Sequence, residues 1–299
     1  MARATNFPFY AESAHYSFKD LLVAYDFSEA ADTSLKYAVM LSRHFRSFIH
    51  LLSVQSPAEY SSALESGPLA MQLSQRDLQF DLRRIEKRLR TEGIENDATR
   101  RIGNVSDIVE GAILEQKPDL LLLGAFGYGP ADRPRLGSTA EHLLRSVRCP
   151  VLTVGPHAIL HEREAPPIQR ILCATSSLVT PDDIVFFAGQ LAARMKAQLE
   201  IVHAVDATHQ ELPKHHHEQR CEEWRRSLSE HAISVSWTLL YGTAGDVIAA
   251  RASESKASVI LFGLHRRGNT MIDCPDGVVS ATIRQAHCPV MTVPLGLRL

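Results

Sequence analysis

The chain of 299 residues lacks the features of several specialised classes of protein. No apolar run approaches the roughly 20 residues that a membrane-spanning helix needs. Residues 1–20 contain no apolar core of the signal-peptide type. The formal net charge of -2 provides no general attraction for nucleic acid or for an anionic membrane. We therefore expect a cytoplasmic protein that binds neither a membrane nor nucleic acid.

Cysteine is scarce and is not spaced for a disulfide framework or a zinc site. The sequence has 5 cysteines, an odd number, and none forms a CxxC pair, which favours a reducing compartment. Three adjacent histidines, His215, His216 and His217, lack the i, i+4 spacing with which a helix presents two ligands to one metal. We interpret them as a solvated segment, and we assign no metal ligand and no catalytic residue.

An internal repeat is the clearest feature that is present. The stretch "RSVRCPVLTV" (145–154) matches "RQAHCPVMTV" (284–293), and the offset between Cys149 and Cys288 also relates Gly124 to Gly263. A weaker match joins residues 21–42 to 171–192 at a slightly longer offset. The chain therefore holds two copies of one module, which we place at residues 17–155 and 168–296. The segment between them contains several prolines and is predicted to be a linker.

Short apolar runs alternate with helical patterns within each copy. In the first copy we expect strands at residues 21–25, 48–54, 97–102, 119–123 and 151–154. We expect helices at residues 28–44, 77–92, 105–115 and 139–146, the first of them capped by Ser28. This order predicts an α/β fold of two tandem doubly wound modules, each a roughly five-stranded parallel sheet with helices on both faces.

A glycine-rich loop follows the fourth strand. Gly124 and Gly127 allow the backbone to bend where a side chain would block a ligand. Gly137, Ser138 and Thr139 precede a helix, whose free N–H groups and dipole favour phosphate. The structural alternative is that the glycines shape a turn and that Ser138 caps the helix in an S-x-x-E box. The loop lacks the lysine of a P-loop and does not fit the dinucleotide fingerprint.

The spacing Gly124-x2-Gly127-x9-Gly137-Ser138 matches the G-x2-G-x9-G-[S/T] nucleotide motif of the universal stress protein family. The stretch "VAYDFSEAA" resembles the opening strand and turn of that family, and the Cys-Pro-Val strands resemble its closing strand. The resemblance covers nearly the whole chain, as a tandem two-module member. It implies a Rossmann-like nucleotide-binding fold and a regulatory role in the stress response, with ATP bound wherever the motif is kept.

The resemblance also implies which residues bind the nucleotide. Asp26 and Val54 would line the adenosine end, where a carboxylate can accept from ribose hydroxyls or adenine N–H groups. The ribose and phosphates would be held by Gly124, Gly127, Gly137, Ser138 and Thr139. Mg²⁺ could bridge the phosphates, although the sequence shows no carboxylate dedicated to it. For Asp26, the alternative is a turn or cap residue before Ser28.

The second copy departs from the motif at most of these positions. Asp26 and Val54 correspond to Ser176 and Ala204, and Gly127 corresponds to Arg266. Where the first copy has Gly-Ser-Thr, the second has Asp-Gly-Val (276–278), whose carboxylate would repel phosphate. We therefore predict one competent site, in the first copy. The alternative is that Arg266 and Arg267 bind another anion.

Family members commonly pair through the last strand. We expect residues 151–154 and 290–293 to pair inside the chain as a pseudo-dimer, so that each strand covers the edge of the other. A homodimer of two whole chains is a further alternative. Nucleotide binding would order residues 128–136 and change the surface seen by an unknown protein partner. Two alternatives remain: a slow ATPase in which Asp26 or a group of the glycine-rich loop positions water, and a nucleotide-free interaction module. Cys149 and Cys288 are assigned to packing.

Overall fold

The computed structural model describes residues 17–56, 68–126, 136–175, 183–205, 233–267, 270–271 and 277–295, with a few residues between 219 and 228. Its first half contains strands β1 (Asp20–Ala24), β2 (Phe48–Gln55), β3 (Asn96–Ile102), β4 (Leu120–Gly124) and β5 (Val151–Val154). The helices of that half are α1 (Glu29–Phe45), α3 (Pro68–Thr91), α4 (Val105–Gln116) and α5 (Ser138–Ser146).

The second half repeats this order after a short 3-10 turn, η1 (Pro156–Ala158). Its strands are β6 (Arg170–Thr175), β7 (Gln198–Val205), β8 (Val235–Tyr241), β9 (Val259–Arg267), β10 (Thr270–Met271) and β11 (Val290–Leu295). Its helices include α6 (Asp183–Met195), α8 (Ala244–Glu254) and α9 (Val278–Gln285).

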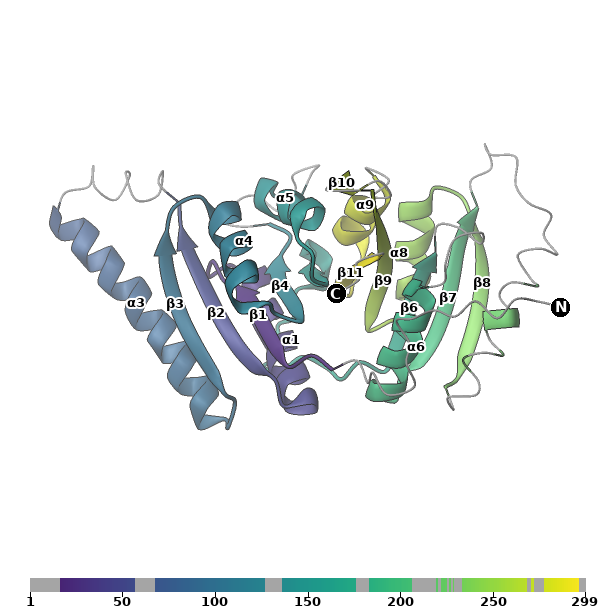
Figure 1. Ribbon diagram of the computed structural model, residues 1–299, viewed down its shortest axis with the longest axis horizontal. Helices are drawn as coiled ribbons and strands as arrows, with labels where there is room; N and C mark the ends of the chain where they lie inside the picture. Colours follow the sequence, from purple (N-terminus) through teal and green to yellow (C-terminus); the bar gives the residue numbers. More distant parts are fainter. Residues whose placement is uncertain are drawn as a thin grey trace.

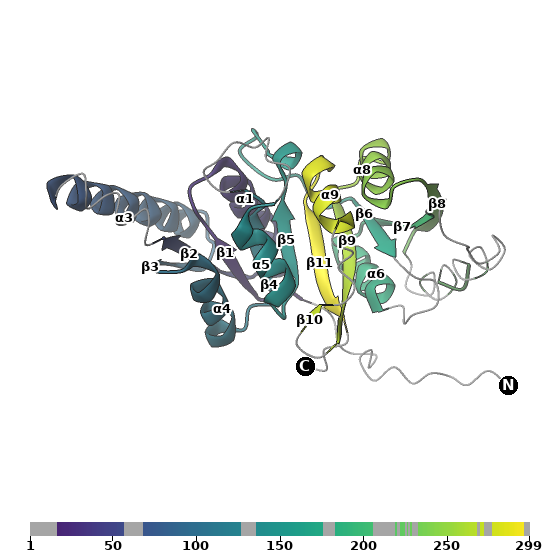
Figure 2. The same cartoon turned by 90° about the horizontal axis from the view of Figure 1, so that it is seen from above.

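The strands form one continuous sheet in the order β3-β2-β1-β4-β5-β11-β9-β6-β7-β8, with β10 paired to β9 (Figure 1). Neighbours within each half run parallel, whereas β5 and β11 pair antiparallel, with Val290 opposite Thr153 and Thr292 opposite Val151. Figure 2 shows these two strands side by side in the middle of the molecule. The predicted fold of two tandem α/β modules is confirmed.

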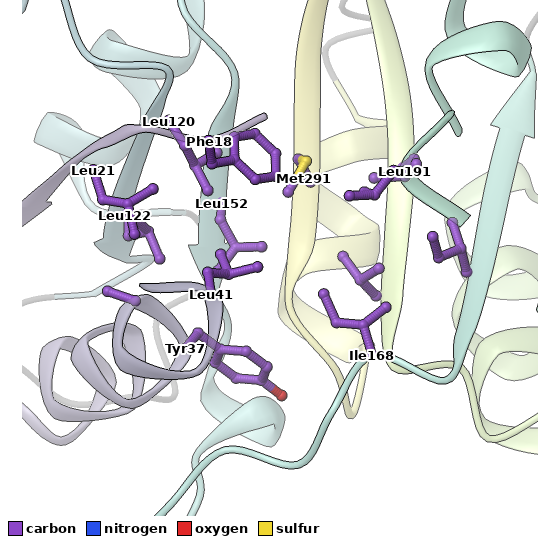
Figure 3. Packing of buried hydrophobic residues seen from close by; sticks show 14 of the residues in the cluster. Phe18, Leu21, Tyr37, Leu41, Leu120, Leu122, Leu152, Ile168, Leu191 and Met291 are labelled. Atoms are coloured by element: carbon purple, nitrogen blue, oxygen red, sulfur yellow. The ribbon is translucent and has the colours of Figure 1, made fainter. Parts of the chain in front are cut away.

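Two hydrophobic cores, one on each face of the sheet, cross the junction between the modules. One core includes side chains of α1, α3 and α6, and the other includes side chains of α4, α5, α8 and α9. Figure 3 shows Met291 of β11 between Phe18 of the first half and Leu191 of α6. All three side chains are almost completely buried. The halves therefore share their cores rather than touching only through backbone hydrogen bonds.

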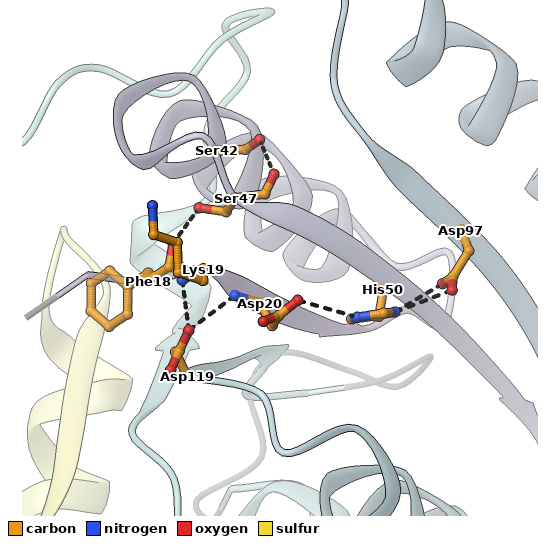
Figure 4. A network of polar contacts seen from close by, with 8 residues as sticks. All are labelled: Phe18, Lys19, Asp20, Ser42, Ser47, His50, Asp97 and Asp119. Atoms are coloured by element: carbon orange, nitrogen blue, oxygen red, sulfur yellow. Dashed lines mark hydrogen bonds and ion pairs between the residues drawn. The ribbon is translucent and has the colours of Figure 1, made fainter.

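A polar network fixes the first strand between its two neighbours (Figure 4). The Asp119 carboxylate accepts from the amides of Lys19 and Asp20, at 2.6 and 3.0 Å, and so joins β1 to the start of β4. On the other side, the ring of His50 lies 3.2 Å from Asp97 and 3.8 Å from Asp20. This network lies at the amino ends of the strands, so it positions the sheet and leaves the opposite edge available.

The linker packs along α1. The Leu160 amide donates to Thr33 Oγ1 at 3.1 Å, Lys36 donates to the Leu160 carbonyl at 2.6 Å, and Arg43 pairs with Glu164 at 2.7 Å. Next to it, His44 of α1 lies 2.9 Å from the Arg194 carbonyl of α6. These contacts hold the two halves in one arrangement.

Two details differ from the sequence-based expectation. Helix α3 begins at Pro68 rather than at residue 77, and proline suits the first turn of a helix because it lacks only an N–H that would be unpaired there. The short strand β10, which pairs with the end of β9, was not expected.

The cysteines assigned to packing are buried. Burial raises the pKa of the Cys149 and Cys288 thiols to about 12, so both stay protonated at neutral pH. No described helix is both long and apolar enough to cross a membrane.

Gly155 provides a test of the module junction. A Cβ built there would collide with the carbonyl oxygen of Ile283 in α9, and the carbonyl carbon of Ile283 would lie only 3.0 Å from it. We expect Gly155→Ala to lower the free energy of unfolding by about 1–3 kcal/mol, measured by chemical denaturation. The control is Gly111→Ala in α4, where a Cβ meets nothing within 4 Å and should stabilise the helix by about 0.5–1 kcal/mol. Equal effects of the two substitutions would contradict this junction.

Candidate functional site

The candidate residues of the first module lie where the strand order reverses. The chain passes from β1 to β2 on one side, whereas β4 pairs on the other side of β1. In open α/β sheets, ligands bind beyond the carboxyl ends of the strands at such a switch point. Asp26 follows β1, Gly124 ends β4, and Val54 is the penultimate residue of β2.

The sheet register brings these three positions to one level. In the register of β1 and β2, Ala24 lies opposite Leu52, and the Tyr25 amide donates to the Leu52 carbonyl at 2.9 Å. Continuing this register two residues along each segment brings Asp26 opposite Val54. Asp26 is exposed, and Val54 is half-buried against the core that includes α4 and α5. A carboxylate and an apolar side chain are thus neighbours at the edge of the sheet.

The turn after β1 is braced on both sides. Phe27 has a φ of 65°, in the left-handed region that side-chain-bearing residues seldom adopt. Its ring stacks edge-on against Tyr25 at 4.9 Å, and the Tyr25 hydroxyl donates to the Asp32 carboxylate. Burial and this bond raise the pKa of Tyr25, so its hydroxyl keeps its proton. The sequence did not predict the contacts of Tyr25 with Phe27 and Asp32, because no short sequence pattern indicates them.

Asp26 itself acts partly as a turn residue. Its Oδ1 accepts from the Ser28 amide at 3.0 Å, and Ser28 Oγ in turn accepts from the Ala31 amide at 3.2 Å as the predicted cap of α1. The structural alternative for Asp26 is therefore present in the molecule. Because one carboxylate oxygen makes this bond, Oδ2 is the oxygen available to a ligand.

The two ends of the glycine-rich loop meet. The Gly137 amide donates to the Ala125 carbonyl at 2.9 Å, and the Ala125 amide donates to Val154 of β5 at 2.8 Å. A Cβ on Gly137 would lie 3.1 Å from the Ala125 oxygen, which is tighter than usual. A Cβ on Gly124 would lie 2.8 Å from that of Ala30, so Gly124 is needed where α1 packs on β4. The bond between Gly137 and Ala125 sets the start of α5 beside the end of β4.

The capping-box prediction for Ser138 is wrong. Gly137 is the N-cap of α5, Ser138 is the first helical residue, and no side chain caps the helix. The first intrahelical bond is donated by the Glu141 amide to Gly137, so the amides of Ser138, Thr139 and Ala140 precede it. The Ser138 side chain is exposed and that of Thr139 is half-buried. Amides and hydroxyls thus gather at one helix end.

The helices α1 and α4 of the first module begin differently from α5. The start of α1 is capped by Ser28, and the start of α4 is capped by Asn104, whose Oδ1 accepts from the Asp107 amide at 3.2 Å. Acidic residues also occupy their first turns. In α5 the one acidic residue there, Glu141, is paired with Arg145 at 3.2 Å. Of these three helix ends, that of α5 is therefore the most favourable for an anion.

The second module keeps the frame of strands and helices at the positions that the structure describes. Gly263 lies within β9, where a Cβ would meet Leu295 and Ile184, and Ala204 stands in β7. Helix α9 begins after Gly277 without a side-chain cap. Gly127, Ser176, Asp276 and the three histidines at 215–217 lie outside the described residues, so their predicted roles stay predictions.

The donor set of the first module fits a phosphorylated nucleoside. Amide and hydroxyl donors at α5 suit phosphate oxygens, and a carboxylate at Asp26 suits ribose hydroxyls. Within the described part of the chain, no group of three His, Cys, Asp or Glu residues could hold a metal ion.

Comparisons with known proteins show what the two modules resemble. The universal stress protein family model matches residues 17–155 and 167–294. A curated universal stress protein from Methanocaldococcus jannaschii, MJ0531, is 27% identical over 140 residues, which is 46% of this chain and 82% of that protein.

Solved structures show the same fold over almost the whole chain. A universal stress protein from Archaeoglobus fulgidus superposes with a TM-score of 0.71 at 19% identity, over 94% of this chain and 100% of the other. A putative universal stress protein from Pseudomonas aeruginosa gives a TM-score of 0.62 at 18% identity, over 93% of each chain.

The two serines at the helix starts should behave differently on substitution. Ser28→Ala removes the cap of α1 and should cost about 1 kcal/mol of unfolding free energy. Ser138→Ala removes an exposed hydroxyl that caps nothing and should stay within about 0.5 kcal/mol of the parent. Urea denaturation of both variants without added ligand measures this, and a larger loss for Ser138→Ala than for Ser28→Ala would refute the cap assignment.

Proposed function

The chain belongs to the universal stress protein family, and we propose that it is an ATP-binding regulator of the stress response with one competent site, in its first module. The observation that carries the proposal is the hydrogen bond from Gly137 to Ala125, because it places the uncapped start of α5 beside the end of β4. The module boundaries at 17–155 and 168–296 are part of the same proposal.

In the proposed complex, the amides and hydroxyls of Ser138 and Thr139 hold the phosphates, and Gly124, Gly127 and Gly137 keep the backbone close to the ribose and phosphates. Asp26 accepts from the ribose or adenine, and Val54 provides apolar contact for the adenosine. Mg²⁺, when bound, neutralises phosphate charge. Each role matches the chemistry of its group: N–H and O–H donors for an anion, and a carboxylate for hydroxyl donors.

The proposed effect of nucleotide binding is a change in the protein surface near the site. A nucleotide at this place would touch both Gly124 and the start of α5. We propose that its binding changes the surface of the first module and that a protein partner binds to the changed surface. We propose that this happens in the cytoplasm, where the described cysteines, Cys149, Cys173 and Cys288, are free thiols. In this scheme the two modules act as an intrachain pseudo-dimer.

The test is calorimetric titration of the full chain with ATP, ADP and adenosine. Replacing both Ser138→Ala and Thr139→Val should weaken ATP and ADP by about 10-fold or more and adenosine much less, because bonds to charged phosphate are lost. Asp26→Asn should weaken all three ligands. The control is Ser106→Ala, in the first turn of the capped neighbour α4, which should bind as the parent does.

Two outcomes would count against this proposal. Absence of binding by the parent chain with Mg²⁺ present would leave the nucleotide-free interaction module. Equal loss of affinity for ATP and adenosine in the Ser138/Thr139 variant would place the phosphates elsewhere. Chromatography of the same samples would detect ADP formed from ATP, and steady formation would favour the slow hydrolase.

A further inference from the structure

The residue before Asp26 is fixed at both its backbone and its side chain. The Tyr25 amide donates to the Leu52 carbonyl of β2 at 2.9 Å. The Tyr25 hydroxyl donates to the carboxylate of Asp32, in the first turn of α1. Tyr25 is buried, so its hydroxyl has little access to water and depends on Asp32 for its hydrogen bond. The chain therefore enters the turn at Asp26 from one defined position.

The residue after Asp26 has a conformation that a phenylalanine rarely adopts. The φ of Phe27 is 65°, in the left-handed region, where a side chain costs free energy that glycine avoids. Packing offsets this cost, because the Phe27 ring meets the Tyr25 ring edge-on, with centroids 4.9 Å apart, and contacts the core that includes α1. Strained backbone of this kind persists where surrounding contacts impose it, and it is found preferentially at functional sites.

The turn between the two rings presents the Asp26 carboxylate. Asp26 is exposed, and its Oδ1 accepts from the Ser28 amide at 3.0 Å, which leaves Oδ2 for a ligand. The direction of the Asp26 side chain is set by the backbone of residues 25–27, and the contacts of Tyr25 and Phe27 fix that backbone on each side. A carboxylate held in one direction binds a hydroxyl or N–H more tightly than a mobile one, because less conformational entropy is lost on binding.

The second module has lost the two rings together with the carboxylate. In the weaker of the two repeat matches, the carboxylate becomes Ser176, and the two aromatic residues become Thr175 and Ser177. The aspartate at position 32 is kept, as residue 182. Both modules connect their first strand to a helix here, so the connection alone does not require the rings. The rings thus occur in the module in which a carboxylate stands between them.

We propose that Tyr25 is a positioning residue for nucleotide binding: through its bond to Asp32 and its contact with the Phe27 ring, it holds Asp26 where Oδ2 accepts from the adenosine. Tyr25 acts from beneath the turn and does not touch the ligand, because its side chain is buried and its hydroxyl is bonded to Asp32. This role rests on the proposed function above, and it adds a residue that lies outside the glycine motif.

The experiment is a double-substitution cycle on the full chain with Tyr25→Phe and Asp26→Asn. Tyr25→Phe keeps the ring and removes the hydroxyl that donates to Asp32. In calorimetric titrations it should weaken adenosine and ATP alike, by about threefold or more, because the bond acts at the adenosine end. In the Asp26→Asn background the same change should alter ATP affinity by less than about twofold, because the group that it positions is gone. ATP suits the cycle because its phosphate contacts keep binding measurable.

Tyr37→Phe is the matched control. Tyr37 is a buried tyrosine of the same core, 4% exposed against 5% for Tyr25, and Figure 3 shows its hydroxyl pointing toward the junction between the modules. Removal of that hydroxyl should leave every ligand within about twofold of the parent. Asp32→Ala removes the acceptor of the Tyr25 bond and should reproduce the loss seen with Tyr25→Phe. Urea denaturation checks that each variant is folded during the titrations.

Amide exchange without ligand gives a second readout. The peptide covering residues 26–31 should exchange faster in Tyr25→Phe than in the parent or in Tyr37→Phe, because the turn is less firmly held. Unchanged ATP affinity in Tyr25→Phe, with Asp26→Asn still weakened, would overturn the role of Tyr25 and leave the first-module site standing. An equal loss in both backgrounds would also overturn it, since the effect would not pass through Asp26. Failure of the parent to bind any nucleotide would overturn both proposals.

Discussion

The antiparallel pairing of β5 with β11 is the contact on which the rest of the molecule depends. Without it, each strand would be the exposed edge of a parallel sheet, with a row of unpaired backbone groups. With it, one sheet runs through both modules, and a hydrophobic core on each face crosses the junction. The pairing also fixes where β9 and its hairpin meet α5.

The glycines of the motif do not all serve one purpose. Gly124 has no space for a side chain because α1 packs against it, and Gly263 is equally confined by Ile184 and Leu295. Both modules keep this glycine, whereas the Gly-Ser-Thr at residues 137–139 occurs in the first alone. The shared glycine therefore follows from packing between helix and strand, and the difference between the modules lies at the start of α5. That is where the chemistry of a ligand would be decided.

Much of the fold could be predicted because the repeat and the strand patterns are local. The strands, the cap at Ser28 and the pairing of the last strands needed only periodicity, capping chemistry and the family resemblance. The start of α5 without a side-chain cap could not be predicted, because the sequence does not show that Gly137 is the N-cap or that its amide bonds to Ala125 across the loop. The position of β10 beside α5 likewise depends on tertiary packing between modules. The sequence thus predicts where the candidate residues stand on strands and helices, whereas the hydrogen bonds among them come from the structure alone.

The central claim is that this two-module chain holds one nucleotide, in its first module. The most direct measurement is the nucleotide content of the freshly purified chain, released by denaturation, identified by chromatography and quantified per chain, beside a Gly127→Arg variant that copies the second module. The account predicts about one ATP or ADP per chain and its loss in the variant. About two per chain would contradict the assignment of a single site. None, even after incubation with ATP and Mg²⁺, would contradict nucleotide binding itself.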